Sequence, residues 1–397
     1  MFRPRAIPVL LACAGTACSY AQSASPFVNT NIFEPVSTPA HEVHSLSLFV
    51  LLITGGICLG MYALLVYALA KYRSRPGETM EPPQVFGSTQ IELAWTIIPI
   101  LLITVLFLGT ARVIFAIQDA PKPANALDVI VVGHQFWWEF RYPKYGVVTA
   151  NELHVPQSTK EQPQATFLKL TSADVMHSFW VPRLAGKTDL LPNRVNEMWF
   201  DPHVPGTYVG QCAQFCGAEH AKMLLRIYVD PPDKFAAWIR NQQQASAELA
   251  ESASETTQGQ QGARRIPATE TASEDATTAR IWKLEREAER QLDLQDGGGS
   301  SNSSAKDART GQRVFERQAC VNCHTVRGTI ANGRFGPDLT HLMSRDTIGA
   351  GIMPNTQLNL IGWITDPNDT KPGCLMPAMH LTEEQNAEIT AYLLTLR

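Results

Sequence analysis

Two long uncharged apolar runs near the N-terminus constrain the fold of this chain more than any other feature. The first, SLSLFVLLITGGICLGMYALLVYALA, covers residues 45–70, and the second, LAWTIIPILLITVLFLGTA, covers residues 93–111. A bilayer core requires about 20 consecutive apolar residues, and neither run has the polar face of a helix in a soluble protein. We therefore predict a hairpin of transmembrane helices over residues 45–70 and 92–116, joined by a loop over residues 71–91.

The charges that flank the first apolar run predict the orientation of the hairpin. Lys71, Arg73 and Arg75 follow the run directly, whereas residues 22–44 before it contain no Lys or Arg. Short loops rich in Lys and Arg stay on the cytoplasmic side of a bacterial membrane. We therefore expect the connecting loop to be cytoplasmic and everything after Arg112 to lie outside, in an oxidising compartment.

The first residues of the chain have the order that is typical of a secretory signal. Arg3 and Arg5 precede a short apolar stretch, and small residues lead to Ala21. We predict a signal peptide over residues 1–21 that is cleaved after Ala21. Lipid attachment at Cys13 is the alternative, although the apolar stretch before this cysteine is short for a signal.

The chain beyond the hairpin divides by composition. Residues 122–235 contain strand-length segments rich in β-branched and aromatic residues, separated by Pro, Gly and Asn, which predicts an all-β sandwich or barrel. Residues 236–305, rich in Gln, Ala, Ser, Thr, Glu and Gly, predict a flexible linker. Residues 306–397 form a further unit with the motif CVNCH near its start. The net charge of −4 and the lack of a basic stripe exclude nucleic acid as a partner.

One short stretch, GQCAQFCGAEHAKM, gathers Cys212, Cys216, His220 and Met223. Thiolate, imidazole and thioether groups are ligands that suit copper. One copper ion cannot easily use both thiolates together with two histidines and a methionine, whereas two copper ions can share the sulfurs as bridges and take one histidine each. A disulfide, a zinc site and a pair of unreactive thiols are the alternatives. A disulfide would leave His220 and Met223 without a purpose, and zinc would leave Met223 without one.

A second histidine for this site must come from another strand. His177, in ADVMHSFWVP, is the best candidate because an apolar strand pattern follows it and would hold it beside the cysteine-containing loop. His134, His154 and His203 are the alternatives, and His203 lies in the turn-like segment DPHVPG.

The motif CVNCH predicts covalent attachment of one c-type haem. Cys320 and Cys323 would form the thioether bonds, and His324 would be an axial ligand of the iron. A thioredoxin-like CxxC is the alternative, but no βαβ pattern surrounds this motif. Met376 is preferred to Met379 as the second axial ligand, because Met-Pro ahead of a terminal helix resembles the ligand loop of small class I cytochromes c.

The same resemblance concerns two further residues of the C-terminal unit. The segment GPDL resembles the one whose proline carbonyl supports the axial histidine, so Pro337 is expected to orient His324. Cys374 has no predicted role beyond that of an exposed or packed thiol.

The pattern Cys-x-x-x-Cys-Gly-x-x-His-x-x-Met, the preceding His-Ser-Phe-x-Val-Pro, the segment GHQ followed by aromatic residues, and the N-terminal hairpin together resemble subunit II of haem-copper cytochrome c oxidases. The resemblance covers residues 40–232. It implies a cupredoxin-like domain that holds the binuclear copper centre called CuA. The implied ligands are Cys212 and Cys216 as bridging thiolates, His177 and His220 as terminal ligands, Met223 as a weak ligand, and the backbone carbonyl of Gln214.

Two departures from the family pattern limit what the resemblance implies. The position of Gln214 is usually a glutamate that reaches a magnesium ion at the interface with subunit I, so the presence of magnesium stays open. The first aromatic residue after Gln135 is commonly the tryptophan through which electrons from cytochrome c enter. Here it is Phe136, followed by Trp137 and Trp138, and burial within a strand is the alternative role for all three.

Glu92 stands at the cytoplasmic start of the second apolar run. The resemblance places a glutamate there at the mouth of a proton pathway into subunit I. The spacing of Thr89 and Glu92 also fits a capping box, in which Glu92 would satisfy the start of the helix.

These patterns predict a multidomain membrane protein with a two-helix transmembrane hairpin, an all-β cupredoxin-like Greek-key domain and a C-terminal all-α cytochrome c domain. The resemblance implies the electron-entry subunit of a bacterial terminal respiratory oxidase in the plasma membrane, with its copper and haem domains on the periplasmic face. Its partners would be subunit I, where oxygen is reduced to water with proton pumping, subunit III, and a soluble or membrane-bound electron donor. The alternative is the electron-transfer subunit of a nitric oxide reductase of the same superfamily. The paired cysteines exclude a quinol oxidase subunit.

Overall fold

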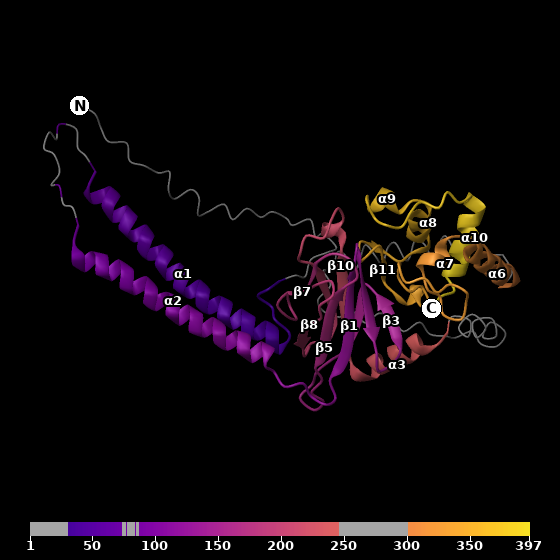
Figure 1. The fold of residues 1–397 in the computed structure, drawn as a ribbon, viewed down its shortest axis with the longest axis horizontal. Coiled ribbons are helices and arrows are strands. Elements are labelled where there is room, and N and C mark those ends of the chain that lie inside the picture. Colours follow the sequence, from indigo (N-terminus) through magenta and orange to yellow (C-terminus); the bar gives the residue numbers. More distant parts are fainter. Residues whose placement is uncertain (1–30, 74–76, 78–83, 85–86, 246–300) are drawn as a thin grey trace.

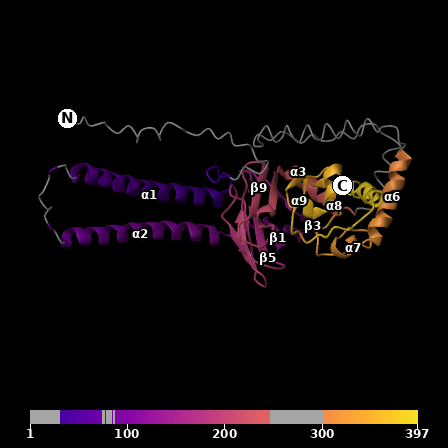
Figure 2. The same cartoon turned by 90° about the horizontal axis from the view of Figure 1, so that it is seen from above.

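The computed structural model describes residues 31–73, 77, 84, 87–245 and 301–397. The predicted signal segment with Cys13, and most of the predicted linker, lie outside these residues. The described parts follow one another along the long axis of the molecule: a helical hairpin, a β-sandwich and a mostly helical C-terminal domain (Figures 1 and 2).

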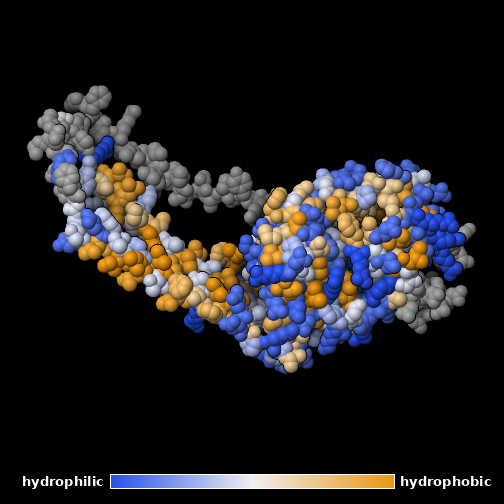
Figure 3. Space-filling model, viewed as in Figure 1, coloured by the Kyte–Doolittle hydropathy of each residue, from blue (hydrophilic) through white to orange (hydrophobic). Residues whose placement is uncertain are grey.

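The hairpin consists of α1 (Thr38–Lys71) and α2 (Thr89–Gln118), which run side by side (Figures 1 and 2). Both are long and apolar enough to cross a membrane. Their surface is largely apolar, in contrast to the mixed surface of the rest of the chain (Figure 3). Ser37 caps the start of α1, because its side chain accepts a hydrogen bond from the backbone N–H of Ala40.

The capping box expected from Thr89 and Glu92 does not form. Ser88 occupies the N-cap position of α2 without a side-chain capping hydrogen bond, and Thr89 is already the first helical residue, so Thr89 cannot be the N-cap. The backbone N–H of Glu92 donates to the Ser88 carbonyl at 3.0 Å as an ordinary helical bond, and the Glu92 side chain is exposed. The spacing of a capping box was present without its geometry, because the helix begins one residue earlier than the pattern requires.

The β-sandwich contains two five-stranded sheets, with strand orders β3-β2-β1-β5-β8 and β4-β10-β9-β6-β7. The pairs β1–β5 and β4–β10 are parallel, and the other pairs are antiparallel. The strands of the first sheet are β1 (Leu127–His134), β2 (Trp137–Tyr142), β3 (Val147–Ala150), β5 (Thr166–Ser172) and β8 (Asn196–Phe200). Those of the second are β4 (Glu152–Pro156), β6 (His177–Trp180), β7 (Thr188–Leu190), β9 (Gly206–Cys212) and β10 (Leu224–Asp230).

The sandwich encloses a single apolar core. Alternate residues of β5 are buried, as the two-residue period of a strand with one covered face requires. Phe179 of β6 meets Trp138 and Phe140 of the opposite sheet edge-on, with ring centroids 5.6 and 6.4 Å apart. The core therefore joins the two sheets directly behind the strands that carry His177 and Cys212.

The helix α3 (Pro232–Gln243) follows the last strand and extends into the segment predicted as linker. Phe235 and Ile239 are buried against the sandwich, and Trp238 stacks on His154 with ring centroids 4.3 Å apart. The residues beyond β10 are mostly polar, so their composition did not indicate this helix. A helix needs only one apolar stripe to pack against a domain.

The C-terminal domain is mostly helical, with one short pair of strands. A capping box of Thr382 and Gln385 begins its last helix, as the sequence LTEEQ requires. Phe315 and Tyr392 pack together in its core, with ring centroids 5.6 Å apart. Its elements are α6 (Ser301–Arg317), α7 (Cys320–Cys323), η2 (Leu342–Ser344), β11 (Thr347–Ile348), β12 (Met353–Pro354), α8 (Gln357–Thr365), α9 (Pro367–Thr370) and α10 (Glu383–Leu393).

Candidate metal centre and haem site

The connection between β9 and β10 brings the two cysteines of the sandwich together with two histidines. Cys212 ends β9 and Cys216 lies in the following loop, and their Sγ atoms are 3.9 Å apart. The Nδ1 atom of His177 lies 3.9 Å from Cys212 Sγ, and the Nδ1 atom of His220 lies 3.7 Å from Cys216 Sγ. Each histidine therefore faces a different sulfur.

Strand pairing explains why His177 lies beside a cysteine far along the chain. The strands β6 and β9 are antiparallel neighbours, with Phe179 opposite Cys212, and His177 begins β6. The donor atoms of His177, Cys212 and Cys216 all lie within 4.8 Å of one another, and the three residues are buried. The alternative histidines have other partners: His134 stacks on Trp137, His154 on Tyr228 and Trp238, and His203 lies beside Asp201.

The two remaining predicted ligands also reach the sulfurs. The Sδ atom of Met223 lies 3.8 Å from Cys216 Sγ, and the backbone carbonyl oxygen of Gln214 lies 3.1 Å from Cys212 Sγ. Met223 is held in place by a backbone hydrogen bond, in which the N–H of Cys212 donates to its carbonyl at 3.0 Å. The Gln214 contact uses a backbone oxygen, so it does not depend on the side chain at this position.

The charge state of the cysteine pair agrees with a site for positive metal ions. The hydrogen bond with Cys216, helped by His177, lowers the pKa of Cys212 to about 3. The same contact raises the pKa of Cys216, because a second negative charge would lie 3.9 Å from the first. Two thiolates at this distance need a nearby cation. The sulfur separation is also about twice the length of a disulfide bond, which is roughly 2.05 Å.

Asp174 orients His177 and was missed from the sequence. Its Oδ1 lies 2.8 Å from His177 Nε2, which leaves Nδ1 directed at Cys212. Burial raises the pKa of Asp174, but hydrogen bonds from His177, Gln135 and Val175 outweigh this effect and lower the net pKa, so the group is a carboxylate. A carboxylate behind a ligating histidine fixes its tautomer and ring orientation. The spacing Asp-x-x-His is the sequence pattern from which Asp174 could have been predicted to support His177.

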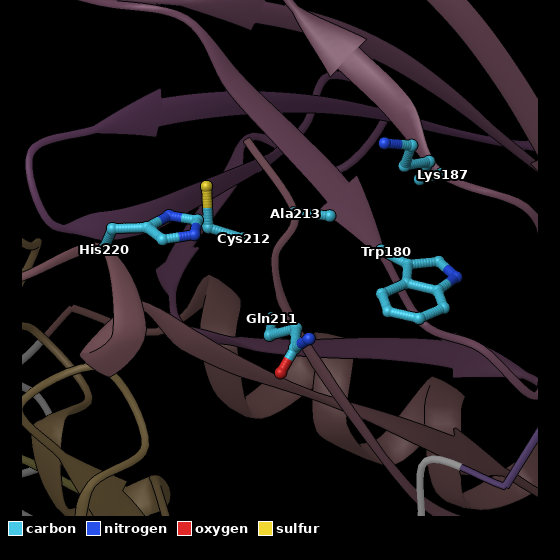
Figure 4. Close-up of a pocket in the computed structure, with 6 residues that line it drawn as sticks. All are labelled: Trp180, Lys187, Gln211, Cys212, Ala213 and His220. Atoms are coloured by element: carbon cyan, nitrogen blue, oxygen red, sulfur yellow. The ribbon is translucent and has the colours of Figure 1, made fainter. Parts of the chain in front are cut away.

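The site is open on one side. A pocket of about 500 Å³ adjoins it, and His220 lies next to Cys212 in that pocket, away from Trp180 and Lys187 (Figure 4). The pocket is lined by Trp180, Lys187, Gln211, Cys212, Ala213 and His220. The neighbouring Phe215 is 75% exposed, so the cysteine loop presents an apolar residue at the surface.

The three aromatic residues after Gln135 are all buried, but they face different neighbours. Trp138 is fully buried, and its Nε1 lies 3.5 Å from the Met223 carbonyl oxygen. Trp137 instead packs with Ala150 and with Ala350 of the C-terminal domain. The structure therefore places Trp138 behind the cysteine site and Trp137 at the boundary between the domains.

The short helix α7 presents the predicted haem-attachment residues. Cys320 and Cys323 are its first and last residues, and His324 follows directly. The Nδ1 atom of His324 lies 2.8 Å from the Pro337 carbonyl oxygen, which leaves Nε2 as the nitrogen for a metal. Burial lowers the pKa of His324, so the ring is neutral, as a metal ligand must be. A Cβ atom at Gly336 would lie 2.6 Å from the imidazole Cε1, so a larger residue here would force the imidazole or the loop to shift.

The predicted methionine ligand lies in the segment between α9 and α10. Met376 is half-buried there, and its carbonyl oxygen accepts the Cys374 thiol at 3.6 Å. Met379 is also half-buried. Burial raises the pKa of Cys374, so this thiol stays protonated near neutral pH.

Comparisons with known proteins match all three described parts. Residues 26–110 match the family model of the cytochrome c oxidase subunit II transmembrane domain, residues 127–229 that of its periplasmic domain, and residues 308–397 that of cytochrome c. These parts, with their cysteine and histidine sites, define a membrane-bound subunit of a haem-copper terminal oxidase, an oxidoreductase.

Relatives with curated names cover most of the chain. Cytochrome c oxidase subunit 2 of Alkalihalophilus pseudofirmus is 31% identical over 374 residues, which cover 93% of this chain and 91% of the relative. Cytochrome c oxidase subunit 2 of Bacillus sp. strain PS3 is 31% identical over 344 residues, 82% of this chain and 80% of the relative. The chain therefore belongs to the cytochrome c oxidase subunit II family, in a form with a cytochrome c domain at its C-terminal end. The periplasmic domain of subunit II from Bradyrhizobium japonicum has 30% sequence identity and a TM-score of 0.28, over 31% of this chain and 95% of that structure.

Proposed function

We propose that this chain is the electron-entry subunit of a bacterial terminal oxidase, in which the C-terminal domain accepts electrons from a donor and the sandwich domain passes them to subunit I. The pairing of each histidine with a different sulfur carries the proposal, because it suits two metal ions that share both thiolates. His177 Nδ1 faces Cys212 at 3.9 Å and His220 Nδ1 faces Cys216 at 3.7 Å. The six residues of the resemblance, including the Gln214 carbonyl and Met223, are the proposed ligands of the binuclear copper centre.

The C-terminal domain supplies the proposed haem ligands. Cys320 and Cys323 would hold haem c covalently, with His324 and Met376 as axial ligands. When bound, copper and haem c supply reversible one-electron oxidation and reduction. The residues of this chain would bind these groups and fix the positions of the ligand atoms.

The remaining parts of the proposal concern proton entry, partners and orientation. The exposed Glu92 at the start of α2 is proposed as a proton-entry residue for subunit I. Subunit III and a soluble or membrane-bound donor are further proposed partners, and the sandwich and cytochrome domains are proposed to lie on the periplasmic face. Gln214 offers no carboxylate, so we do not include magnesium among the proposed cofactors.

Paired variants of the full-length chain in its complex test this assignment. Replacing Cys320 and Cys323 by alanine should abolish covalent haem and leave copper content unchanged. Replacing Cys212 by alanine should abolish copper binding and leave covalent haem unchanged. The first variant should still oxidise small artificial donors that reach the sandwich domain directly. Zinc in place of copper, or a disulfide between Cys212 and Cys216, would contradict the copper assignment.

A further inference from the structure

The sandwich and the cytochrome domain meet through an interface to which each side contributes a buried side chain with an ionisable group, Glu152 from the sandwich and Lys371 from the cytochrome domain. Segments from the sandwich, including β4 and β10, face β11 and the loops of the cytochrome domain, and the views in Figures 1 and 2 show the two domains adjacent. Within the described residues, this contact joins parts of the chain that the predicted linker separates.

Lys371 provides the buried charge of the cytochrome domain. It is only 3% exposed, and its Nζ donates to the carbonyl oxygens of Phe136 at 2.8 Å, Lys222 at 2.9 Å and Gly349 at 3.2 Å. An ammonium group has three donors, so every one of them is used. Two of the three acceptors belong to the sandwich domain. The side chain of Lys371 therefore links the cytochrome domain to backbone carbonyls of the sandwich.

The ammonium remains charged in this position. Burial lowers the pKa of Lys371 to about 8, opposed by the carboxylate of Glu219, while Lys222 lowers it and the thiols Cys216 and Cys374 raise it. The amine is thus mostly protonated near neutral pH. A buried charge is tolerated only where hydrogen bonds replace its water, and separating the domains would break the two bonds from Lys371 to the carbonyls of Phe136 and Lys222.

Glu152 is the buried carboxyl group that the sandwich contributes, and burial raises its pKa. It is 2% exposed, and its carboxylate accepts hydrogen bonds from the backbone N–H groups of Asp346 at 3.0 Å and Thr347 at 2.8 Å. The Thr347 hydroxyl donates to the same carboxylate at 2.6 Å. A backbone hydrogen bond from the Leu224 N–H to the Ala350 carbonyl, 3.2 Å long, also crosses the interface.

Lys371 also brings the two ligand-bearing segments together. Its acceptor Lys222 directly precedes Met223, and Lys371 itself begins the segment that leads to Met376. In that segment, Gly373 has a φ of +89°, and a Cβ atom there would lie 3.2 Å from Ala218 Cβ. Ala218 lies in the loop between Cys216 and His220. The methionine segment therefore touches the cysteine loop.

We propose that Lys371 is a positioning residue for electron transfer between the domains, because it fixes the methionine segment of the cytochrome domain against the cysteine loop of the sandwich. The inference rests on the proposed function. In the transfer step, one electron leaves the reduced cytochrome domain, which is oxidised, and enters the sandwich domain, which is reduced. No bond is made or broken in this step.

The test compares K371M with K169M in the full-length complex. Lys169 is an exposed residue of β5, so K169M makes the same chemical change away from the interface. Hydrogen exchange is read at the amides of Leu224, Asp346 and Thr347, which donate across the interface. In K371M we expect exchange at these amides to become roughly tenfold faster or more, with about 1.4 kcal/mol for each factor of ten. Exchange within α10 should not change.

Electron transfer is the second measurement. After rapid reduction of the cytochrome domain, transfer to the sandwich should slow in K371M by a factor similar to the change in exchange. The reduction potential and copper content should stay as in the wild type. The conservative variant K371R, which keeps a charged donor, should recover part of the rate. The variant E152Q weakens the interface at its sandwich side and alters neither ligand segment. It should also speed exchange at the same three amides, so the interface can be tested even if K371M fails to incorporate haem.

The outcomes separate this inference from the proposed function. Wild-type exchange at the three amides in both K371M and E152Q, or unchanged transfer in K371M despite faster exchange, would overturn the positioning role alone. A wild-type complex with normal metal content but no transfer between the domains would refute the proposed function, and the inference with it.

Discussion

The carboxylate of Asp174 holds the imidazole of His177 with its Nδ1 toward Cys212. The Asp174 Oδ1 and His177 Nε2 atoms are 2.8 Å apart, and the opposite ring nitrogen lies 3.9 Å from the Cys212 sulfur. Asp174 also accepts the backbone N–H of Gln135 at 2.6 Å, which joins it to the turn before β2. The direction of the histidine is therefore set by groups outside the proposed ligand set.

Replacing Asp174 by asparagine should weaken copper binding. The amide can present its NH2 to His177 and favour the wrong tautomer, and loss of such a supporting carboxylate typically costs about 10–100-fold in metal affinity. Competition with a copper chelator measures the effect. The matched control is Asp128→Asn, at an exposed carboxylate of β1. Equal copper retention in both variants would show that Asp174 does not support the site.

Replacing Gln214 should leave copper in place. Its backbone oxygen, 3.1 Å from Cys212 Sγ, is the proposed ligand atom, and Q214A keeps that atom. We expect unchanged copper content and visible spectrum in Q214A, and loss of both in C212A. The variant Q214E restores a carboxylate and should add binding of a divalent cation in the assembled complex, which manganese substitution and electron paramagnetic resonance can detect. Loss of the visible spectrum in Q214A would show that copper binding depends on the Gln214 side chain rather than on its carbonyl oxygen.

Sequence patterns were sufficient for the fold class and for residues that share a loop. The two apolar runs predicted the hairpin because a membrane helix is specified by length and composition alone. Cys212, Cys216, His220 and Met223 could be identified because they are neighbours in sequence and remain neighbours in the loop. His177 is 35 positions from Cys212 and lies beside it only through the pairing of β6 with β9.

Other features depend on tertiary contacts that no local pattern records. The Thr89 and Glu92 spacing suggested a capping box, but the N-cap of α2 is Ser88 and the helix already begins at Thr89. Nothing in the sequence around Lys371, which precedes Pro-Gly, indicates that it is buried. Its burial arises only because the two domains meet there. The predicted flexible linker begins at residue 236, inside α3, whose apolar stripe is short and surrounded by polar residues.

Replacing Gly336 by alanine should disturb the haem site. The added Cβ would lie 2.6 Å from Cε1 of His324, so the imidazole or the loop must shift. Such overpacking typically costs about 1–3 kcal/mol. We expect a lower thermal midpoint and reduced covalent haem. The control is Gly362→Ala in α8, where nothing lies within 4 Å and alanine should stabilise the helix by about 0.5–1 kcal/mol. Equal haem content and stability in the two variants would contradict the close packing at His324.

Glu139 should stabilise the sandwich in a pH-dependent way. Burial raises the pKa of its carboxyl, but His134 and Arg141 together lower it more, so the net pKa lies below its ordinary value of 4.5. Folding therefore favours the ionised form. The stabilisation is complete above 4.5 and is lost as the pH falls through the folded-state pKa. Near neutral pH, E139Q should cost about 1.5–3 kcal/mol, the usual worth of a hydrogen bond to a charged group. Denaturant unfolding at several pH values should show the wild type and E139Q converging in acid, while E197Q, at an exposed carboxylate of β8, stays parallel to the wild type. A constant gap between wild type and E139Q across this range would mean that packing, rather than charge, accounts for the role of Glu139.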